Sequence, residues 1–370
     1  MSHRTQQPPE FHVPWGLNFF GSLVCKTSGF WKWLGDRETS FLIDDLERRP
    51  ITAPIYICGL ARSGSTILLE LLTAHADVAT HRYIDFPPVY TPCLWHLVRG
   101  MIPRAQPDPV ERTHQDGMMV TADSPEAMEE VLWMSFFSRL HNPLKIGILD
   151  AKTSQPDFEK FYADHIRKML RIRNGTRYAA KGNYNLARID YLLKLFPDAR
   201  IVVPIRKPVT HVASMQKQQR LFCKGQSLNP KMLAHLQRVG HFEFGLDRRP
   251  INVGNENILR EIMDLWEAGD EIRGWARYWA YIYGYVADLL ETSPLINSAV
   301  KVLKYEDLCD DAGDTITSLL NHCQLEDDDR LSHEISKRIH YPDYYKITFT
   351  PEEIATVNDE TQPVAARFGY

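Results

Sequence analysis

The sequence predicts an α/β fold in which a parallel sheet is flanked by helices. Apolar segments of strand length alternate with segments whose leucines recur at helical spacing, which is the pattern of a parallel sheet. The chain has 370 residues, 44% hydrophobic and 24% charged, an ordinary composition for a globular protein. We find no internal repeat and no low-complexity linker. We therefore expect an N-terminal segment over residues 1–49 and a single domain over residues 50–370.

The first expected unit is a strand, a tight loop and a helix. The segment APIYICGL, residues 53–60, is apolar and of strand length. It is followed by STILLELLTAH, residues 65–75, which places leucines at helical spacing. A second series continues the alternation with a strand at 178–183, a helix at 187–196, a buried strand at 197–208, a helix at 209–219 and a last strand at 298–308.

Two further segments predict long helices. Ser124 is a suitable N-cap and Pro125 a suitable first helical residue, so we expect a long helix to begin there. Residues 260–290 carry a second helical pattern. Its aromatic stripe is expected to face the core rather than an acceptor pocket, and consists of Trp275, Tyr278, Trp279 and Ile282.

The N-terminal segment divides into a tail and an aromatic part. Residues 1–14 are polar and contain several prolines, so we expect a disordered tail. Residues 15–49 are unusually rich in Trp and Phe and predict one or two helices that pack on the main domain. Lys and Arg are too sparse there to favour contact with anionic lipid.

Charge and cysteine usage exclude several classes of protein. The net charge of −4 gives no general basic field, so we expect no nucleic-acid partner. The six cysteines form no C-x-x-C pair and no zinc spacing, so we expect reduced thiols and no metal. The N-terminus lacks a signal-peptide pattern and no apolar run is long enough to span a membrane. We expect a cytoplasmic protein without stable membrane insertion. The composition is also compatible with a homo-oligomer.

The loop after the first strand has the spacing of a phosphate-binding loop but lacks its lysine. Gly59 is followed after four residues by Gly64, and Ser65 stands where the lysine normally does. What remains is one cation, Arg62, with side-chain hydroxyls and the backbone N–H groups of a helix N-terminus. Such groups suit a small tetrahedral anion bound without metal.

A second anion motif follows the buried strand at 197–208. Arg206 leaves the carboxyl end of this strand, and Ser214 comes eight residues later in the next helix. Ligands of open α/β sheets bind at the carboxyl ends of the strands, so we expect both motifs to share one crevice. Two such sites would flank one nucleotide.

With these two motifs the chain resembles the sulfotransferases that use 3′-phosphoadenosine 5′-phosphosulfate. The resemblance implies a P-loop NTPase-like sheet with helical insertions that bind the acceptor, a small molecule or lipid that receives the sulfuryl group on a hydroxyl. It covers residues 54–82 and 178–218, with fainter likeness at 300–308 and in the terminal RFGY. The donor-binding positions that it implies are Arg62, Ser63, Gly64, Ser65, Thr66, Arg206, Ser214 and Tyr305.

The resemblance also suggests catalytic residues. In-line transfer needs cations at the bridging and sulfuryl oxygens, and we assign Arg62 and Lys181 to them. A solvated surface position is the alternative for Lys181, and simple packing is the alternative for Tyr305. Asp85 follows the first helix near the usual base position and is the first candidate for the general base, with His81 second. Further candidates are His114, Asp116 and Glu130.

Departures from the family pattern leave two alternatives open. Lys207 follows Arg206 where an acidic or polar residue is frequent, and the segment HRYIDFPP lacks the glutamate that many relatives place there. A kinase-like enzyme would use Lys207 in place of the loop lysine and Glu306 or Asp307 for magnesium. A non-catalytic anion-binding protein on the same fold is the other alternative.

Overall fold

The computed structural model describes residues 11–101, 108–326, 339, 341 and 347–370. Five parallel strands form the central sheet in the order β2-β5-β1-β6-β7. They are β1 (Ile55–Ile57), β2 (Val78–Ala79), β5 (Arg177–Lys181), β6 (Arg200–Ile205) and β7 (Val300–Lys304). A small antiparallel pair, β3 (Val110–Glu111) and β4 (Met119–Val120), lies apart from this sheet. The predicted α/β class with a parallel sheet is confirmed.

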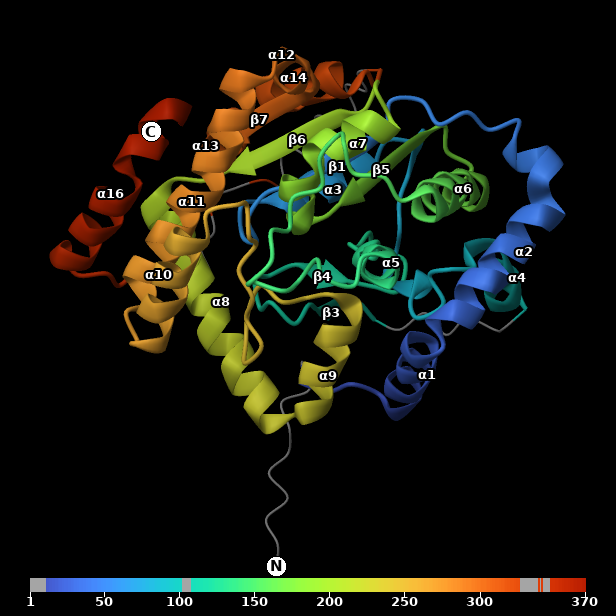
Figure 1. Cartoon of the computed structure of the whole chain (residues 1–370), viewed down its shortest axis with the longest axis horizontal. Helices are drawn as coiled ribbons and strands as arrows, with labels where there is room; N and C mark the ends of the chain where they lie inside the picture. Colours follow the sequence, from blue (N-terminus) through green and yellow to red (C-terminus); the bar gives the residue numbers. More distant parts are fainter. Residues whose placement is uncertain (1–10, 102–107, 327–338, 340, 342–346) are drawn as a thin grey trace, which may run out of the picture.

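Helices cover both faces of the sheet (Figure 1). In chain order the described helices are α1 (Trp15–Lys26), α2 (Ser28–Leu46), α3 (Ser65–Thr73), α4 (Pro92–Gly100), α5 (Glu130–Phe136), α6 (Pro156–Arg173), α7 (Ile189–Leu195), α8 (Pro208–Leu228), α9 (Pro230–Val239), α10 (Glu256–Glu267), α11 (Glu271–Thr292), α12 (Pro294–Ala299), α13 (Tyr305–Asp310), α14 (Ala312–Cys323) and α16 (Pro351–Ala365). None of the described helices is long and apolar enough to cross a membrane.

Side chains that point alternately to the two faces of the sheet divide the core into two layers. In β6, Ile201 and Val203 join the cluster that includes residues of α6, α8 and α11, whereas Val202 joins the cluster beneath α3 and α14. Successive side chains of a strand point to opposite faces, so a sheet covered on both sides needs apolar residues at every position. This explains why the predicted strands are continuously apolar.

The parallel arrangement brings the two anion motifs to one edge of the sheet. Strands β1 and β6 are neighbours, with Ile55 opposite Arg200 and Ile57 opposite Val202. The chain therefore leaves both carboxyl ends on the same side, into α3 from β1 and into α8 from β6. This is the crevice position expected for a ligand of an open α/β sheet.

Both predicted long helices differ from the structure. Only Glu130–Phe136 is helical in the segment expected to begin at Ser124, because residues before it run across the site and Pro125 forms a β-bridge with Arg82. The pattern at 260–290 is broken into α10 and α11, and Gly269 adopts a left-handed φ of 83° between them. The stripe of aromatic and apolar residues on α11 is buried, as predicted.

The N-terminal expectations are partly wrong. Phe11 and Val13 are buried rather than disordered, because the Phe11 ring packs against Phe222 and its carbonyl accepts a hydrogen bond from Asn229. The expected disorder of residues 1–10 lies outside the described residues. In α1 and α2 only part of the aromatic side chains pack on the domain, whereas Trp15 is 71% exposed.

His211 ties α8 to the loop that precedes α3. Its Nε2 donates to the carbonyl oxygen of Ala61 at 2.9 Å, and its side chain is fully buried. Burial lowers the pKa of His211 to about 3. The unfolded chain therefore binds a proton below about pH 6.5 that the folded chain does not accept, so stability is lost as pH falls below this value.

We predict that His211→Gln, which keeps a hydrogen-bond donor, reduces the acid sensitivity of the fold. The loss of unfolding free energy between pH 7 and pH 5 should be smaller than in the wild type by about 2 kcal/mol. Denaturant unfolding at both pH values measures this difference. His96→Gln, on an exposed face of α4, is the control and should lose as much unfolding free energy between pH 7 and pH 5 as the wild type. An equal loss in His211→Gln would contradict the proposed link between His211 and the acid sensitivity of the fold.

Candidate active site

A cavity of about 410 Å³ opens beside the loop between β1 and α3. Its polar side chains include Arg62, Thr66, Arg112, His114, Glu126 and Lys181. Its apolar side chains include Phe86, Met128, Trp133, Phe222, Met232 and Leu236. One wall is therefore charged and the other apolar, as in sites that hold a polar reacting group next to an apolar ligand body.

The loop has a backbone that requires glycine at one position. Arg62 and Gly64 both have left-handed φ values, 76° and 101°, and Gly64 is the N-cap of α3. A Cβ atom at Gly64 would lie 2.7 Å from the ring of Tyr305, which is buried against the loop. The first N–H groups of α3 have no acceptor within the helix, as at any helix N-terminus, and helix N-termini are suited to bind anions.

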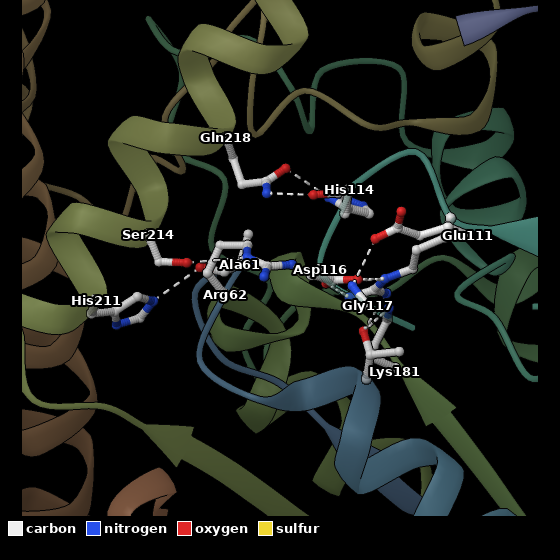
Figure 2. A network of polar contacts seen from close by, with 12 residues as sticks. Ala61, Arg62, Glu111, His114, Asp116, Gly117, Lys181, His211, Ser214 and Gln218 are labelled. Atoms are coloured by element: carbon white, nitrogen blue, oxygen red, sulfur yellow. Dashed lines mark hydrogen bonds and ion pairs between the residues drawn. The ribbon is translucent and has the colours of Figure 1, made fainter. Parts of the chain in front are cut away.

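Arg62 joins the two predicted anion motifs. Its Nε donates to Ser214 Oγ at 3.3 Å, and its Nη1 lies 2.7 Å from Asp116 Oδ2. Figure 2 shows the guanidinium between α8 and the segment that carries Asp116. The structure thus brings the loop cation and the serine of the second motif into direct contact.

Lys181 points into the same cavity. Its Nζ donates to Thr66 Oγ1 at 3.0 Å and to Glu126 Oε1 at 3.0 Å, and the side chain is only 11% exposed. The alternative of a solvated surface lysine is therefore wrong. Burial raises the pKa of Glu126, but the Lys181 charge and a hydrogen bond from Tyr83 outweigh it and hold that pKa well below its usual range.

Arg112 is a further cation that the sequence analysis missed. Its guanidinium holds both oxygens of Asp116 and donates to Thr66 Oγ1 at 3.1 Å. The residue belongs to the connection between β3 and β4 and has no motif around it, so no signal in the sequence could have marked it. Arg112 therefore reaches the loop only through the tertiary structure.

Asp116 is ion-paired and unsuited to the predicted role of base. Burial raises its pKa, but Arg112 and Arg62 outweigh this effect and hold the pKa well below the usual range of a carboxyl group. Such a carboxylate has little affinity for a proton. Asp116 instead holds the two guanidinium groups side by side.

Sequence comparison identifies the group of proteins to which this site belongs. The pattern of the sulfotransferase family matches residues 54–249, more than half of the chain, and spans both anion motifs. The chain belongs to the sulfotransferase family. Among the curated proteins, none is similar enough in sequence to count as a relative.

Solved structures of bacterial sulfotransferases are similar to this sulfotransferase at low sequence identity. Sulfotransferase STF1 from Mycobacterium tuberculosis H37Rv is 18% identical, with 95% of this chain and 84% of that chain covered and a TM-score of 0.46. Sulfotransferase STF9 from Mycobacterium avium is 14% identical, with 90% and 80% covered and a TM-score of 0.47. A sulfotransferase from Alicyclobacillus acidocaldarius is 14% identical, with 86% and 94% covered and a TM-score of 0.39.

Asp85 and His81, the first candidates for the base, do not line the cavity of this sulfotransferase. Both oxygens of Asp85 lie 2.6 Å from Arg173 Nη2, and Asp85 also accepts from the backbone of Arg82. His81 is buried with its Nε2 2.9 Å from the Nε2 of His165. The geometry argues against both assignments, because Arg173 and His165 engage these side chains, whereas their neighbours Tyr83 and Phe86 line the cavity.

Glu130 lines the cavity but is neutralised by two partners. Arg188 contacts both of its oxygens at 2.7 and 2.8 Å, and His141 lies at 2.6 Å. Burial raises the pKa of Glu130, but the charges of Arg188 and His141 outweigh it and lower the pKa to about 2. Glu130 is therefore a poor base.

His114 has the geometry of a neutral base. The side-chain amide of Gln218 donates from Nε2 to the His114 carbonyl oxygen at 2.8 Å. The Oε1 atom of the same amide therefore faces His114 Nδ1, at 3.2 Å (Figure 2). Nδ1 must therefore carry the proton, and Nε2 has a free lone pair. Burial, followed by the charges of Arg112 and Arg62, lowers the pKa of His114 well below 6.5, so the ring is uncharged at neutral pH.

The remaining donor-site predictions divide into two groups, because Arg206, Ser214 and Tyr305 are buried and do not line the cavity, whereas Ser65 and Thr66 do. Arg206 is 6% exposed, donates from Nε to Thr210 at 3.2 Å and lies with its guanidinium carbon 5.0 Å from the centre of the Tyr305 ring. Ser65 and Thr66 begin α3 and line the cavity. Ser63, unlike Ser65 and Thr66, is fully buried and does not line the cavity. Its Oγ packs so closely on Gly59 that a Cβ atom at Gly59 would lie 2.8 Å from it.

We predict that Gly64→Ala destabilises the fold more than Gly117→Ala. Both positions have left-handed φ values, which cost a residue with a Cβ about 1–2 kcal/mol. Gly117 has nothing within 4 Å of an added Cβ, whereas Gly64 meets the Tyr305 ring. Denaturant unfolding should show the larger loss of unfolding free energy for Gly64→Ala. Equal losses in the two variants would mean that Tyr305 moves aside freely.

Proposed function

We propose that this sulfotransferase transfers the sulfuryl group of 3′-phosphoadenosine 5′-phosphosulfate to a hydroxyl of an apolar small-molecule or lipid acceptor. The observation that carries the proposal is the position of Arg62. It joins the lysine-free loop to Ser214 and lies in the same cavity as Lys181. A donor with phosphates at both ends of one nucleoside matches two anion motifs at one edge of the sheet.

The residues present fit this donor. Arg112 and Lys181 both donate to Thr66 at the start of α3, and Asp116 joins Arg62 to Arg112, an arrangement that suits the phosphosulfate end. Arg206 and Ser214 stand at the start of α8 and suit the 3′-phosphate. Among the described residues there is no group of three or more His, Cys, Asp and Glu side chains that could hold a metal.

The chain's own residues supply charge stabilisation and proton removal. The bound donor provides the sulfuryl group and a bisphosphate leaving group. Arg62 and Lys181 would stabilise the negative charge that builds on the bridging oxygen, an effect worth about 2.7–4 kcal/mol for a well-aimed donor. The acceptor hydroxyl oxygen forms the new S–O bond as the old one breaks, and His114 Nε2 would take the hydroxyl proton.

The charge of the donor would bring His114 closer to the pKa that a base needs. Arg112 and Arg62 contribute to the low pKa of His114. Negative phosphate and sulfate oxygens beside these guanidinium groups offset their charge, which raises the pKa of the imidazole. His114 would thus become a stronger base when the donor is bound.

The apolar wall supports an apolar acceptor. Phe86, Trp133, Phe222, Met232 and Leu236 line the side of the cavity formed by α5, α8, α9 and the segment after η2 (Tyr83–Asp85). Burial of an apolar acceptor against such surface is favourable by about 25 cal/mol per Å². A strongly polar acceptor would lose its hydration where it contacts these apolar side chains.

The kinase-like alternative is less well supported by the same residues. Glu306, one of the two carboxylates considered for magnesium beside Asp307, accepts from the backbone N–H of Lys207 at 3.0 Å and from Tyr370 Oη at 2.6 Å. Both oxygens are therefore engaged by protein donors. Lys207 itself is exposed and does not line the cavity beside the loop.

Ligand-dependent stability separates the proposal from its alternatives. Adenosine 3′,5′-bisphosphate, AMP, and ATP with magnesium should be compared by thermal shift. A ligand at 100 times its dissociation constant adds about 2.7 kcal/mol to stability, which is readily measured. Preference for the bisphosphate without metal supports the proposal. Preference for ATP with magnesium supports a kinase, and no response supports a non-catalytic protein.

We predict that Arg206→Ala weakens binding of adenosine 3′,5′-bisphosphate by about 1.5–3 kcal/mol, the worth of a hydrogen bond to a charged group. AMP, which lacks the 3′-phosphate, should bind with nearly unchanged affinity. Titration calorimetry with both ligands measures the contrast, and Lys207→Ala is the neighbouring control. Equal weakening for both ligands would assign Arg206 to the fold or to the adenosine.

We predict that His114→Gln lowers turnover by about 100-fold to 10,000-fold, the usual contribution of a general base. Its affinity for the bisphosphate should change little, because the donor site is intact. Release of bisphosphate from the sulfate donor should be measured with 1-dodecanol and 2-naphthol as apolar test acceptors.

Asp85→Asn is the contrasting variant for this test. It removes the ion pair with Arg173 and should lower the unfolding free energy while the folded enzyme keeps its turnover. Normal turnover in His114→Gln together with lost turnover in Asp85→Asn would return the role of base to Asp85.

A further inference from the structure

Helices α1, α2 and α4 expose large apolar side chains at one end of the molecule. We call the N-terminal apolar face the surface formed by Trp15, Phe19, Phe30, Trp33, Phe41 and Leu97. Phe41 is 89% exposed and Trp15 71% exposed. Soluble proteins rarely leave many large apolar side chains together in water, so this face is a candidate interaction surface.

The exposed rings are ordered by helical spacing. Trp15 and Phe19 are four residues apart on α1 and stack at 5.3 Å with an interplanar angle of 10°. Phe30 and Trp33 are three residues apart on α2, with ring centres 5.8 Å apart. Each helix therefore carries its outward rings along one stripe and has another side for packing on the domain.

The three helices border one another. The ring of Phe20 on α1 lies 5.9 Å from Trp31 of α2 and 6.2 Å from Trp95 of α4. The carboxylate of Glu38 on α2 accepts a hydrogen bond from the backbone of Leu94 on α4. Figure 1 shows α1, α2 and α4 grouped at one end of the molecule, away from α16.

Charge on these helices is balanced. Their basic residues are Lys26, Lys32, Arg37 and Arg99, and their acidic residues are Asp36, Glu38, Asp44 and Asp45. Electrostatic attraction to a strongly charged partner is therefore weak, and burial of aromatic and apolar side chains is the available driving force. Trp and Phe side chains on a surface helix are the residues that enter the interfacial region of a bilayer.

We propose that the N-terminal apolar face binds peripherally to the surface of a lipid bilayer, through its aromatic rings and without a requirement for anionic lipid. Basic residues are too few in this segment to attract anionic lipid. The exposure of the rings removes the need for that attraction.

The face also adjoins the candidate active site. His12, Val13 and Leu17, from the segment leading into α1 and from α1 itself, line the same cavity as His114. One side of α1 thus borders the cavity while Trp15 and Phe19 face outward. If the proposed transferase function holds, this position gives a membrane-dissolved amphiphile with a hydroxyl group a short route to the cavity.

Vesicle flotation of the full chain tests the proposal. We expect similar binding to pure phosphatidylcholine vesicles and to vesicles with one quarter phosphatidylglycerol, and little change between 0.15 and 0.5 M NaCl. Phe19→Ser should reduce the bound-to-free ratio about tenfold, because a ring that is buried on binding is lost. Trp33→Ser, a second exposed position on a different helix, should have a similar effect.

Leu295→Ser is the matched control, since Leu295 on α12 is 57% exposed, the same fraction as Phe19. It should leave vesicle binding unchanged. The proposal is overturned if wild type binds neither vesicle, or only the anionic vesicle at low salt. It is also overturned if Phe19→Ser leaves binding intact, or if size-exclusion chromatography shows that this variant dissociates a dimer formed through the face.

The same variants separate this inference from the transferase proposal. Phe19→Ser should bind adenosine 3′,5′-bisphosphate as the wild type does, because the substitution lies on α1, away from the proposed donor-binding residues on the loop before α3 and on α8. In the wild type, failure of vesicle binding with normal bisphosphate binding would overturn the membrane surface alone. Normal vesicle binding without bisphosphate binding would overturn the proposed donor alone.

Discussion

The contact of Arg62 with Ser214 and Asp116 is the interaction on which the rest of the site depends. A guanidinium group donates several hydrogen bonds in one plane, so it can join three separate chain segments. Here these segments are the loop before α3, the start of α8 and the β3–β4 connection. The left-handed backbone at Arg62 and Gly64 directs this side chain across the sheet edge.

Loss of the loop lysine changes how the anion site is built. In a nucleotide triphosphatase one lysine and a metal ion neutralise the phosphates. In this sulfotransferase the cations come from three places, with Arg62 on the loop, Lys181 at the end of β5 and Arg112 on a distant segment. Asp116 compensates two of these charges in a buried position, which limits the cost of placing several cations together.

Two surfaces of α1 face the candidate active-site cavity and the outside of the molecule. Leu17 contributes to the cavity, whereas Trp15 and Phe19 are exposed to solvent. Helix α1 therefore contributes to the cavity lining through Leu17 and to the apolar outer face through Trp15 and Phe19. Both features favour ligands with large apolar parts, although they are formed by different side chains.

The sequence by itself determined the parallel sheet and the two anion motifs, because strand patterns and loop spacings are local properties of the chain. It also led to Lys181, which follows directly from the end of a predicted strand. Only the tertiary structure decided the surroundings of the reacting groups. Arg112 and the tautomer of His114 depend on partners up to 104 residues away, and Asp85 is held in a buried ion pair with Arg173, 88 residues away. No periodicity or motif encodes such pairings, since they arise only when packing brings distant segments together.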